Sequence, residues 1–188
     1  MYSLLIDTHD KDVLLVLYKN GKVLDKICKE SNLRHSEITM PSLVEIMDRN
    51  DIQIGNIDEI ITVVGPGSFT GVRIGVVIAK TIAYLLKKPI KCITSIDLLY
   101  YSNNLKDGCY RINENKGFFV SVYNNFSLKC ESINYYSKDD YIKTYGDSEV
   151  FFDVNLDLEK IYLYASKLEN TNPHLVNPIY VKQIEALK

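Results

Sequence analysis

The stretch Gly65–Gly75, GPGSFTGVRIG, stands between a short apolar run and a long apolar segment, and it decides how the surrounding chain can fold. Glycines, a proline and two hydroxyl side chains at this density are typical of a loop between a buried strand and a helix N-terminus. Such a loop can present backbone N–H groups and the positive helix end to an anion. It can also be a tight turn in which glycines adopt positive φ.

The loop lacks the motifs that would identify its chemistry. No Gly-Lys-Ser/Thr follows, so it is not a Walker A loop, and Thr70 stands where a GxGxxG loop has its third glycine. Ser68 does not lie in a GxSxG nucleophile elbow. An anion site and a purely structural turn therefore both remain open.

The segments on both sides of the loop predict a strand, loop, helix, strand crossover. Residues 59–64 form an apolar strand, and a long helix, 71–87, follows the loop and ends before Pro89. A strand is predicted over residues 90–94, and Ser95 is a suitable N-cap for a helix to about residue 102.

Three short apolar runs near the N-terminus predict an antiparallel meander, and they comprise residues 2–7, 12–18 and 22–28. Asn20-Gly21, between the second and third runs, is a strong signal for a two-residue hairpin. The crossover is expected to pack on this meander.

A helix is predicted from about Ser36 to Arg49 because apolar side chains recur there at helical spacing. They fall on one face, which consists of Met40, Leu43, Val44 and Met47. Pro41 is acceptable only in the first turn of such a helix.

The second half of the chain gives weaker signals. Residues 103–117 are polar and rich in turn formers, so we place a boundary there between an N-terminal lobe, 1–102, and a shorter C-terminal lobe, 103–188. Strands are predicted over 118–123 and 128–135, a helix over 139–145, and only weak signals follow Val150.

Composition indicates a globular, cytoplasmic protein. The net charge of −2, from 22 basic and 24 acidic residues, does not favour tight nucleic-acid binding by this chain alone. The four cysteines form no CxxC pair and no secretory signal is evident, so reduced cytosolic thiols are expected. The longest apolar stretch, residues 74–86, is interrupted by polar side chains and is too short to span a bilayer, so no membrane association is expected.

The predicted helix 71–87 has a single narrow polar stripe, formed by Arg73, Lys80, Tyr84 and Lys87. Almost all its other residues are apolar, and one stripe cannot cover a surface helix. Either the helix is buried inside the chain, or one apolar face packs on the sheet and another on a second protein. We favour the second interpretation because so short a chain offers few elements to cover both faces.

The Gly65–Gly75 stretch resembles the signature of the TsaB (YeaZ) family. Further matches are Leu5-Ile6-Asp7-Thr8, Arg34-His35-Ser36-Glu37 and Asn177-Pro178-Ile179-Tyr180-Val181. The resemblance is strong over residues 1 to about 100 and faint afterwards. It implies an actin-like ATPase (ASKHA) α/β fold of two ribonuclease-H-like lobes, of which the second is reduced here.

The resemblance also implies a subunit without its own catalytic site. The catalytic TsaD-type relatives carry His-x-x-x-His metal ligands at positions that match Ser95 and Leu99 here, and these side chains cannot replace two imidazoles. The segment that usually reads Asp-Ala-Arg-(Arg/Lys)-Gly-Glu-Val-Tyr appears here as residues 113–120, NENKGFFV, which puts any role of its acidic and arginine positions in doubt.

The partners implied are a TsaD-type catalytic subunit, a TsaE-type ATPase, a second copy of this chain when alone, and tRNA only indirectly. The helices 36–49 and 71–87 are expected to form the partner interface. The candidate interface residues are His35, Met40, Leu43, Met47, Val72, Arg73, Val76, Ala79, Lys80 and Ala83. Which face of helix 71–87 meets the partner is left open, and His35 is expected to cap or pack at its helix start.

The candidate residues of a vestigial phosphate or nucleotide loop are Asp7, Thr8, Gly65, Gly67, Ser68, Thr70 and Gly71. No metal and no cofactor are expected, although weak ATP binding is left open. The alternative is an autonomous ATPase or small-molecule kinase of the same fold, in which Asp7 would face a metal-bound phosphate. This alternative is disfavoured because no second acidic ligand motif and no adenosine-binding Gly-Gly signature are evident. A peptidase is disfavoured too, because the sequence shows no nucleophile–base pair.

Overall fold

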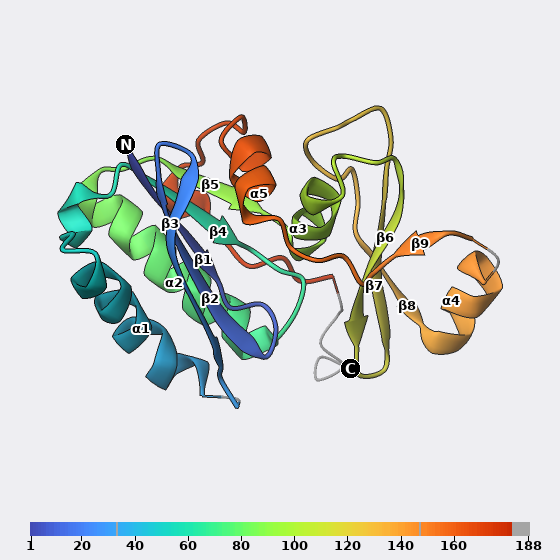
Figure 1. Cartoon of the computed structure of the whole chain (residues 1–188). Helices are drawn as coiled ribbons and strands as arrows, with labels where there is room; N and C mark the ends of the chain where they lie inside the picture. Colours follow the sequence, from blue (N-terminus) through green and yellow to red (C-terminus); the bar gives the residue numbers. More distant parts are fainter. Residues whose placement is uncertain (33, 147, 182–188) are drawn as a thin grey trace.

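The computed structural model describes residues 1–32, 34–146 and 148–181. Two β-sheets and the helices between and outside them form successive layers (Figure 1). Helices α1 and α2 cover the outer face of the first sheet, α3 and α5 lie between the two sheets, and α4 covers the far face of the second sheet.

The first sheet has five strands in the order β3-β2-β1-β4-β5. Its strands are β1 (Tyr2–Asp7), β2 (Asp12–Lys19), β3 (Lys22–Glu30), β4 (Glu59–Val63) and β5 (Ile90–Ile93). The first three are antiparallel, while β4 and β5 run parallel to β1. The predicted meander and crossover are thereby confirmed, and the hairpin turns at Asn20 and Gly21, both at positive φ.

Helices α1 (His35–Arg49) and α2 (Phe69–Leu86) pack on the outer face of this sheet, as predicted. The predicted apolar face of α1 is wrong in half of its members. Leu43 and Met47 are buried, but Met40 and Val44 are about half exposed. Pro41 also lies inside the helix, beyond its first turn.

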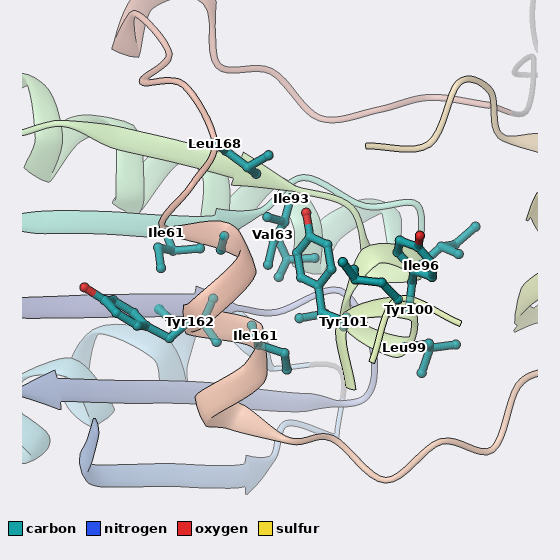
Figure 2. Close-up of a cluster of buried hydrophobic side chains, with 14 of the residues drawn as sticks. Ile61, Val63, Ile93, Ile96, Leu99, Tyr100, Tyr101, Ile161, Tyr162 and Leu168 are labelled. Carbon is teal, nitrogen blue, oxygen red and sulfur yellow. The ribbon is translucent and has the colours of Figure 1, made fainter. Parts of the chain in front are cut away.

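Between the sheets, α3 (Ser95–Ser102) and α5 (Leu158–Ala165) bury the inner face of the first sheet. Figure 2 shows Ile161 and Tyr162 of α5 and Tyr101 of α3 gathered with Ile61 and other aliphatic side chains of β4 and β5. Thr94, not the predicted Ser95, caps α3, because its hydroxyl accepts the Asp97 N–H while the Asp97 carboxylate accepts the Thr94 N–H.

The second sheet has the strand order β8-β7-β6-β9. Its strands are β6 (Gly108–Glu114), β7 (Gly117–Tyr123), β8 (Asn134–Ser137) and β9 (Val150–Phe151), with α4 (Lys138–Tyr145) packed on β7 and β8. The predictions for β7 and α4 are confirmed. The predicted strand 128–135 is wrong over most of its length, and β6 lies in the segment that was predicted to be polar turns.

After α5 the chain returns along the first sheet. Thr171 pairs with Ile90 at the edge of β5, and a short 3-10 helix, η2 (Pro173–Leu175), contacts α2. A second 3-10 helix, η1 (Ile54–Asn56), precedes β4. The division into residues 1–102 and 103–188 stays a prediction.

Helix α2 is long and apolar enough, by length and composition alone, to resemble a membrane span. The apolar stretch that was expected to be too short, residues 74–86, is part of this helix of 18 residues. One side of α2, however, lies in the core against the first sheet, with Val76, Ala79 and Ala83 fully or almost fully buried. This is the packing of a helix in a soluble-type α/β fold.

Candidate functional site

The loop predicted over Gly65–Gly71 connects β4 to α2 but ends earlier, because α2 begins at Phe69 and includes Thr70 and Gly71. Hydrogen bonds fix the loop at both ends. The Ser95 N–H donates to the Gly65 carbonyl, and the Ser95 hydroxyl donates to the Pro66 carbonyl at 2.6 Å. Ser68 is the N-cap of α2, and its hydroxyl accepts the Gly71 N–H at 3.2 Å. Ser95 and Leu99 are both buried.

The turn between β1 and β2 packs closely against this loop. The Ser68 N–H donates to the His9 carbonyl at 2.6 Å, and the Thr8 hydroxyl donates to the Gly71 carbonyl at 2.7 Å. A Cβ atom on Gly67 would overlap the His9 carbonyl oxygen, and one on Gly71 would overlap the Thr8 carbonyl oxygen. Gly67 and Gly71 therefore allow the backbone of the β1–β2 turn to approach the loop closely.

Asp7 lies at the carboxyl end of β1, where the sequence placed it, and is buried. One of its carboxylate oxygens, Oδ1, lies 2.7 Å from His9 Nδ1 and accepts the His9 N–H at 3.0 Å. Burial opposes the imidazolium, but the charge and hydrogen bond of Asp7, together with Asp10, raise the pKa of His9 above its ordinary value. His9 is thus the direct partner of the carboxylate that sequence reasoning assigned to a phosphate.

His35 fastens α1 to the same turn. Its side chain is buried, and its Nε2–H donates to the Asp10 carbonyl at 2.7 Å. The expectation that His35 packs at the start of the helix is therefore met, and it does not lie on an exposed interface.

A cavity of about 570 Å³ lies beside the loop, and Asp10 and Lys11 of the β1–β2 turn form part of its wall. The other segments that line it are the loop itself, the segment 113–115 at the β6–β7 turn, and residues 178–181. Its lining includes Lys11, Ser68, Phe69, Glu114, Phe119 and Tyr180. Of the vestigial-loop candidates, Gly67 and Ser68 line this cavity, whereas the carbonyls of His9 and Thr8 approach the loop at Gly67 and Gly71.

The candidate interface residues divide into three groups. Seven are buried within the chain, and these are His35, Leu43, Met47, Val72, Val76, Ala79 and Ala83. In this structure they cannot contact a partner without leaving the core, so the sheet-facing side of α2 is not the contact side. Met40 and Arg73 are exposed, and Lys80 is partly exposed.

The polar stripe of α2 binds the C-terminal part of this same chain. Arg73 Nε donates to the Tyr180 hydroxyl at 2.7 Å, and Lys80 donates to the Val176 carbonyl at 2.8 Å. Tyr84 packs edge-to-face against His174. Arg73 and Lys80 were predicted to face a partner protein, and the structure engages both with residues 176–180.

The remaining side of the α1–α2 pair exposes large apolar side chains that the sequence-based list missed. They are Val44 of α1 and Val77 and Leu85 of α2, beside the predicted Met40. We call these four residues the outer helix surface. The sequence did contain a signal for this surface, because α2 is apolar on both sides of its polar stripe. That pattern alone does not show which of the two sides packs on the sheet.

Comparisons with known proteins agree with this fold. A family model described as TsaD, tRNA N6-adenosine threonylcarbamoyltransferase, matches residues 23–111. The tRNA threonylcarbamoyladenosine biosynthesis protein TsaB of Bacillus subtilis is 32% identical over 108 residues, which are 57% of this chain and 47% of the relative. TsaB of Buchnera aphidicola subsp. Baizongia pistaciae is 38% identical over 39% of this chain and 33% of the relative.

The solved structure of YeaZ from Pseudomonas aeruginosa superposes on this chain with a TM-score of 0.75. The superposition covers 95% of this chain and 100% of that one at 17% identity, so it bears on the fold alone. By sequence, this chain spans less than half the length of the curated relatives that it matches.

Proposed function

Since this chain belongs to the TsaB (YeaZ) family and has its actin-like ATPase fold, we propose that it is a non-catalytic subunit in the biosynthesis of N6-threonylcarbamoyladenosine in tRNA. In this proposal the chain pairs with a TsaD-type catalytic subunit and helps to recruit a TsaE-type ATPase. It meets tRNA only through that complex, in the cytoplasm.

The outer helix surface is the observation that carries this proposal. Met40, Val44, Val77 and Leu85 are 48–69% exposed and come from two helices that pack against each other. Large exposed apolar side chains on two neighbouring helices favour a protein partner. A second copy of the chain is the expected occupant when the TsaD-type subunit is missing, and such an interface would be self-complementary.

The state of the glycine loop supports a subunit that does not carry out the chemistry. The N–H groups of Ser68 and Gly71 already donate within the chain, and the Thr8 and His9 carbonyl oxygens lie close against Gly71 and Gly67. Carbonyl oxygens repel an anion. We therefore expect no cofactor and at most weak ATP binding.

An autonomous ATPase or small-molecule kinase is the second candidate, and the cavity of about 570 Å³ beside the loop favours it. Asp7 would be its metal-facing carboxylate. This candidate is weaker because Asp7 Oδ1 is already bound to His9, and because residues 1–32, 34–146 and 148–181 contain no cluster of three His, Cys, Asp or Glu side chains arranged to hold a metal.

The test is size-exclusion chromatography with light scattering, on the chain alone and mixed with a TsaD-type subunit, followed by an ATP-turnover assay. We expect pairing without turnover by the chain alone. Leu85→Asp and Val77→Asp should weaken pairing about tenfold or more, since each places a charge in an apolar contact. Charged replacements of Ala79 or Ala83 are unsuitable because these side chains lie in the core.

Ile142→Asp is the matched control, because Ile142 lies on α4 and is 65% exposed, close to the 69% of Leu85. It should pair normally. Equal pairing by Leu85→Asp and Ile142→Asp would contradict the assignment of the surface. A chain that ignores the TsaD-type subunit but hydrolyses ATP would overturn the proposed function in favour of the second candidate.

A further inference from the structure

Residues 171–181, which we call the C-terminal strap, run along α2 from its C-terminal end to its N-terminal end. The first part of the strap is firmly attached. The Thr171 N–H donates to the Ile90 carbonyl at 2.8 Å, and Val176 is buried in the core. Lys80 holds the carbonyl of Val176 from the side of α2. This first part, residues 171–176, which we call the strap root, therefore stays attached to the first sheet.

Residues 178–181, the strap tip, are held by one backbone hydrogen bond, by the packing of Val181 against the core, and by contacts from α2. The Ile179 N–H donates to the Val64 carbonyl at 2.8 Å. The Tyr180 hydroxyl accepts from Arg73, whose guanidinium lies 3.7 Å from the ring centre of Phe69 and 5.3 Å from that of Tyr180. Phe69 and Tyr180 are both about half exposed, and cation–π contacts at exposed sites are weak.

The strap tip stands between two hollows. Ile179, Tyr180 and Val181 line the cavity of about 570 Å³ beside the glycine loop. The same three residues line a second hollow of about 680 Å³, whose other wall is the segment 130–135. A displacement of this one short segment would therefore join the two spaces.

We propose that the strap tip is a gate between these hollows, hinged after Val176 and latched by Arg73 and Phe69 on Tyr180. When Tyr180 leaves Arg73, the tip swings away while the root stays on the sheet. The glycine loop then becomes accessible from the side of residues 130–135. This inference does not depend on the proposed function.

Hydrogen exchange of the whole chain tests the gate, with the Ile179 amide as the reporter of the tip and the Thr171 amide as the reporter of the root. In Arg73→Ala we expect exchange at Ile179 to rise roughly tenfold while Thr171 stays unchanged, since only the latch is removed. Tyr180→Phe keeps the ring and loses the hydroxyl, so its increase should lie between wild type and Arg73→Ala. Lys87→Ala, at the end of the same stripe, is the control.

Thiol labelling gives a second readout. Cys130 lines the second hollow, so it should react faster with a thiol reagent in Arg73→Ala, whereas Cys109, buried beneath α4, should not. Unchanged exchange at Ile179 would overturn the proposal. An equal increase at Thr171 would overturn it too, because the strap would then detach as one unit.

Discussion

The glycines of the 65–75 loop show how far a single residue type can be interpreted from sequence. Their density is compatible with an anion site and with a tight turn that has glycines at positive φ; in the structure Gly65 has positive φ, and other groups approach Gly67 and Gly71 closely. The approaching groups are the Thr8 and His9 carbonyls, and Thr8 stands 63 positions before Gly71. The sequence pattern of the loop cannot distinguish a backbone oxygen from a remote part of the chain from the oxygen of a bound phosphate. Either group can approach only where the residue has no Cβ atom.

Gly71→Ala should lower the free energy of unfolding by about 1–3 kcal/mol, because the added methyl group overlaps the Thr8 carbonyl and the β1–β2 turn must shift. Urea denaturation followed by circular dichroism measures the loss. Gly55→Ala is the control, because a Cβ there meets no atom within 4 Å. A midpoint for Gly71→Ala equal to that of Gly55→Ala would show that the turn adapts without cost.

At the scale of elements, the faces of α1 and α2 were harder to predict than the helices themselves. Polar side chains take part in the buried face of α1, where His35, Thr39 and Ser42 face the core and the Thr39 hydroxyl donates to the His35 carbonyl. A prediction that assigns only apolar side chains to the buried face therefore places Met40 there, although Met40 is exposed. On α2 the polar stripe resembled a surface for another protein because the strap that covers it lies about a hundred residues later.

The elements of the second half were predicted poorly for a related reason. Strand β6 pairs along its whole length with β7, and this pairing holds polar residues such as Arg111 and Asn113 in a strand. Helix α5 has only eight residues, and a helix of that length depends on tertiary packing, here of Ile161 and Tyr162 against the first sheet. Neither contact is visible in a local pattern.

The ion pair between β4 and β5 gives a test at this scale. Lys91 Nζ lies 3.1 Å from the Glu59 carboxylate, both side chains are less than 10% exposed, and Lys91 also donates to the Ser166 carbonyl after α5. Lys91→Met should destabilise the chain by about 3–5 kcal/mol, because it leaves a buried carboxylate unpaired. Chemical denaturation measures this loss.

The double variant Lys91→Met with Glu59→Gln is the control for that experiment. Because it removes the stranded charge, it should recover part of the loss. If the double variant is no more stable than Lys91→Met, the loss comes from the Ser166 contact and not from the unpaired carboxylate.

For the whole molecule, the order of the layers differs from the order of the chain. The N-terminal part forms the first sheet, but α5 and the C-terminal strap return to that sheet after the second sheet is complete (Figure 1). A boundary drawn along the sequence near residue 103 marks where the second sheet begins. Such a boundary cannot show that α5 and the C-terminal strap return to the first sheet. Only weak local signals follow residue 150, and the return depends on tertiary packing.

The two sheets are connected through a buried hydrogen bond from the Tyr123 hydroxyl of β7 to the Asp97 carboxylate of α3, at 2.6 Å. Burial raises the pKa of Asp97, and the hydrogen bonds from Tyr123 and Thr94 partly oppose this. A carboxyl group with a raised pKa in the folded state contributes most stability below its ordinary pKa of 3.8, and this contribution is lost as the pH rises through the raised value.

Tyr123→Phe should therefore destabilise the chain more at pH 7 than near pH 4. Where Asp97 is ionised, the lost hydroxyl leaves a buried carboxylate without one donor, which costs about 1–3 kcal/mol, whereas the protonated group needs that donor less. Denaturation curves at both pH values measure the difference. Tyr101→Phe is the control, since the Tyr101 hydroxyl donates to the neutral Leu128 carbonyl, and its effect should not depend on pH. If both variants respond equally to pH, Asp97 does not control the contact between the sheets.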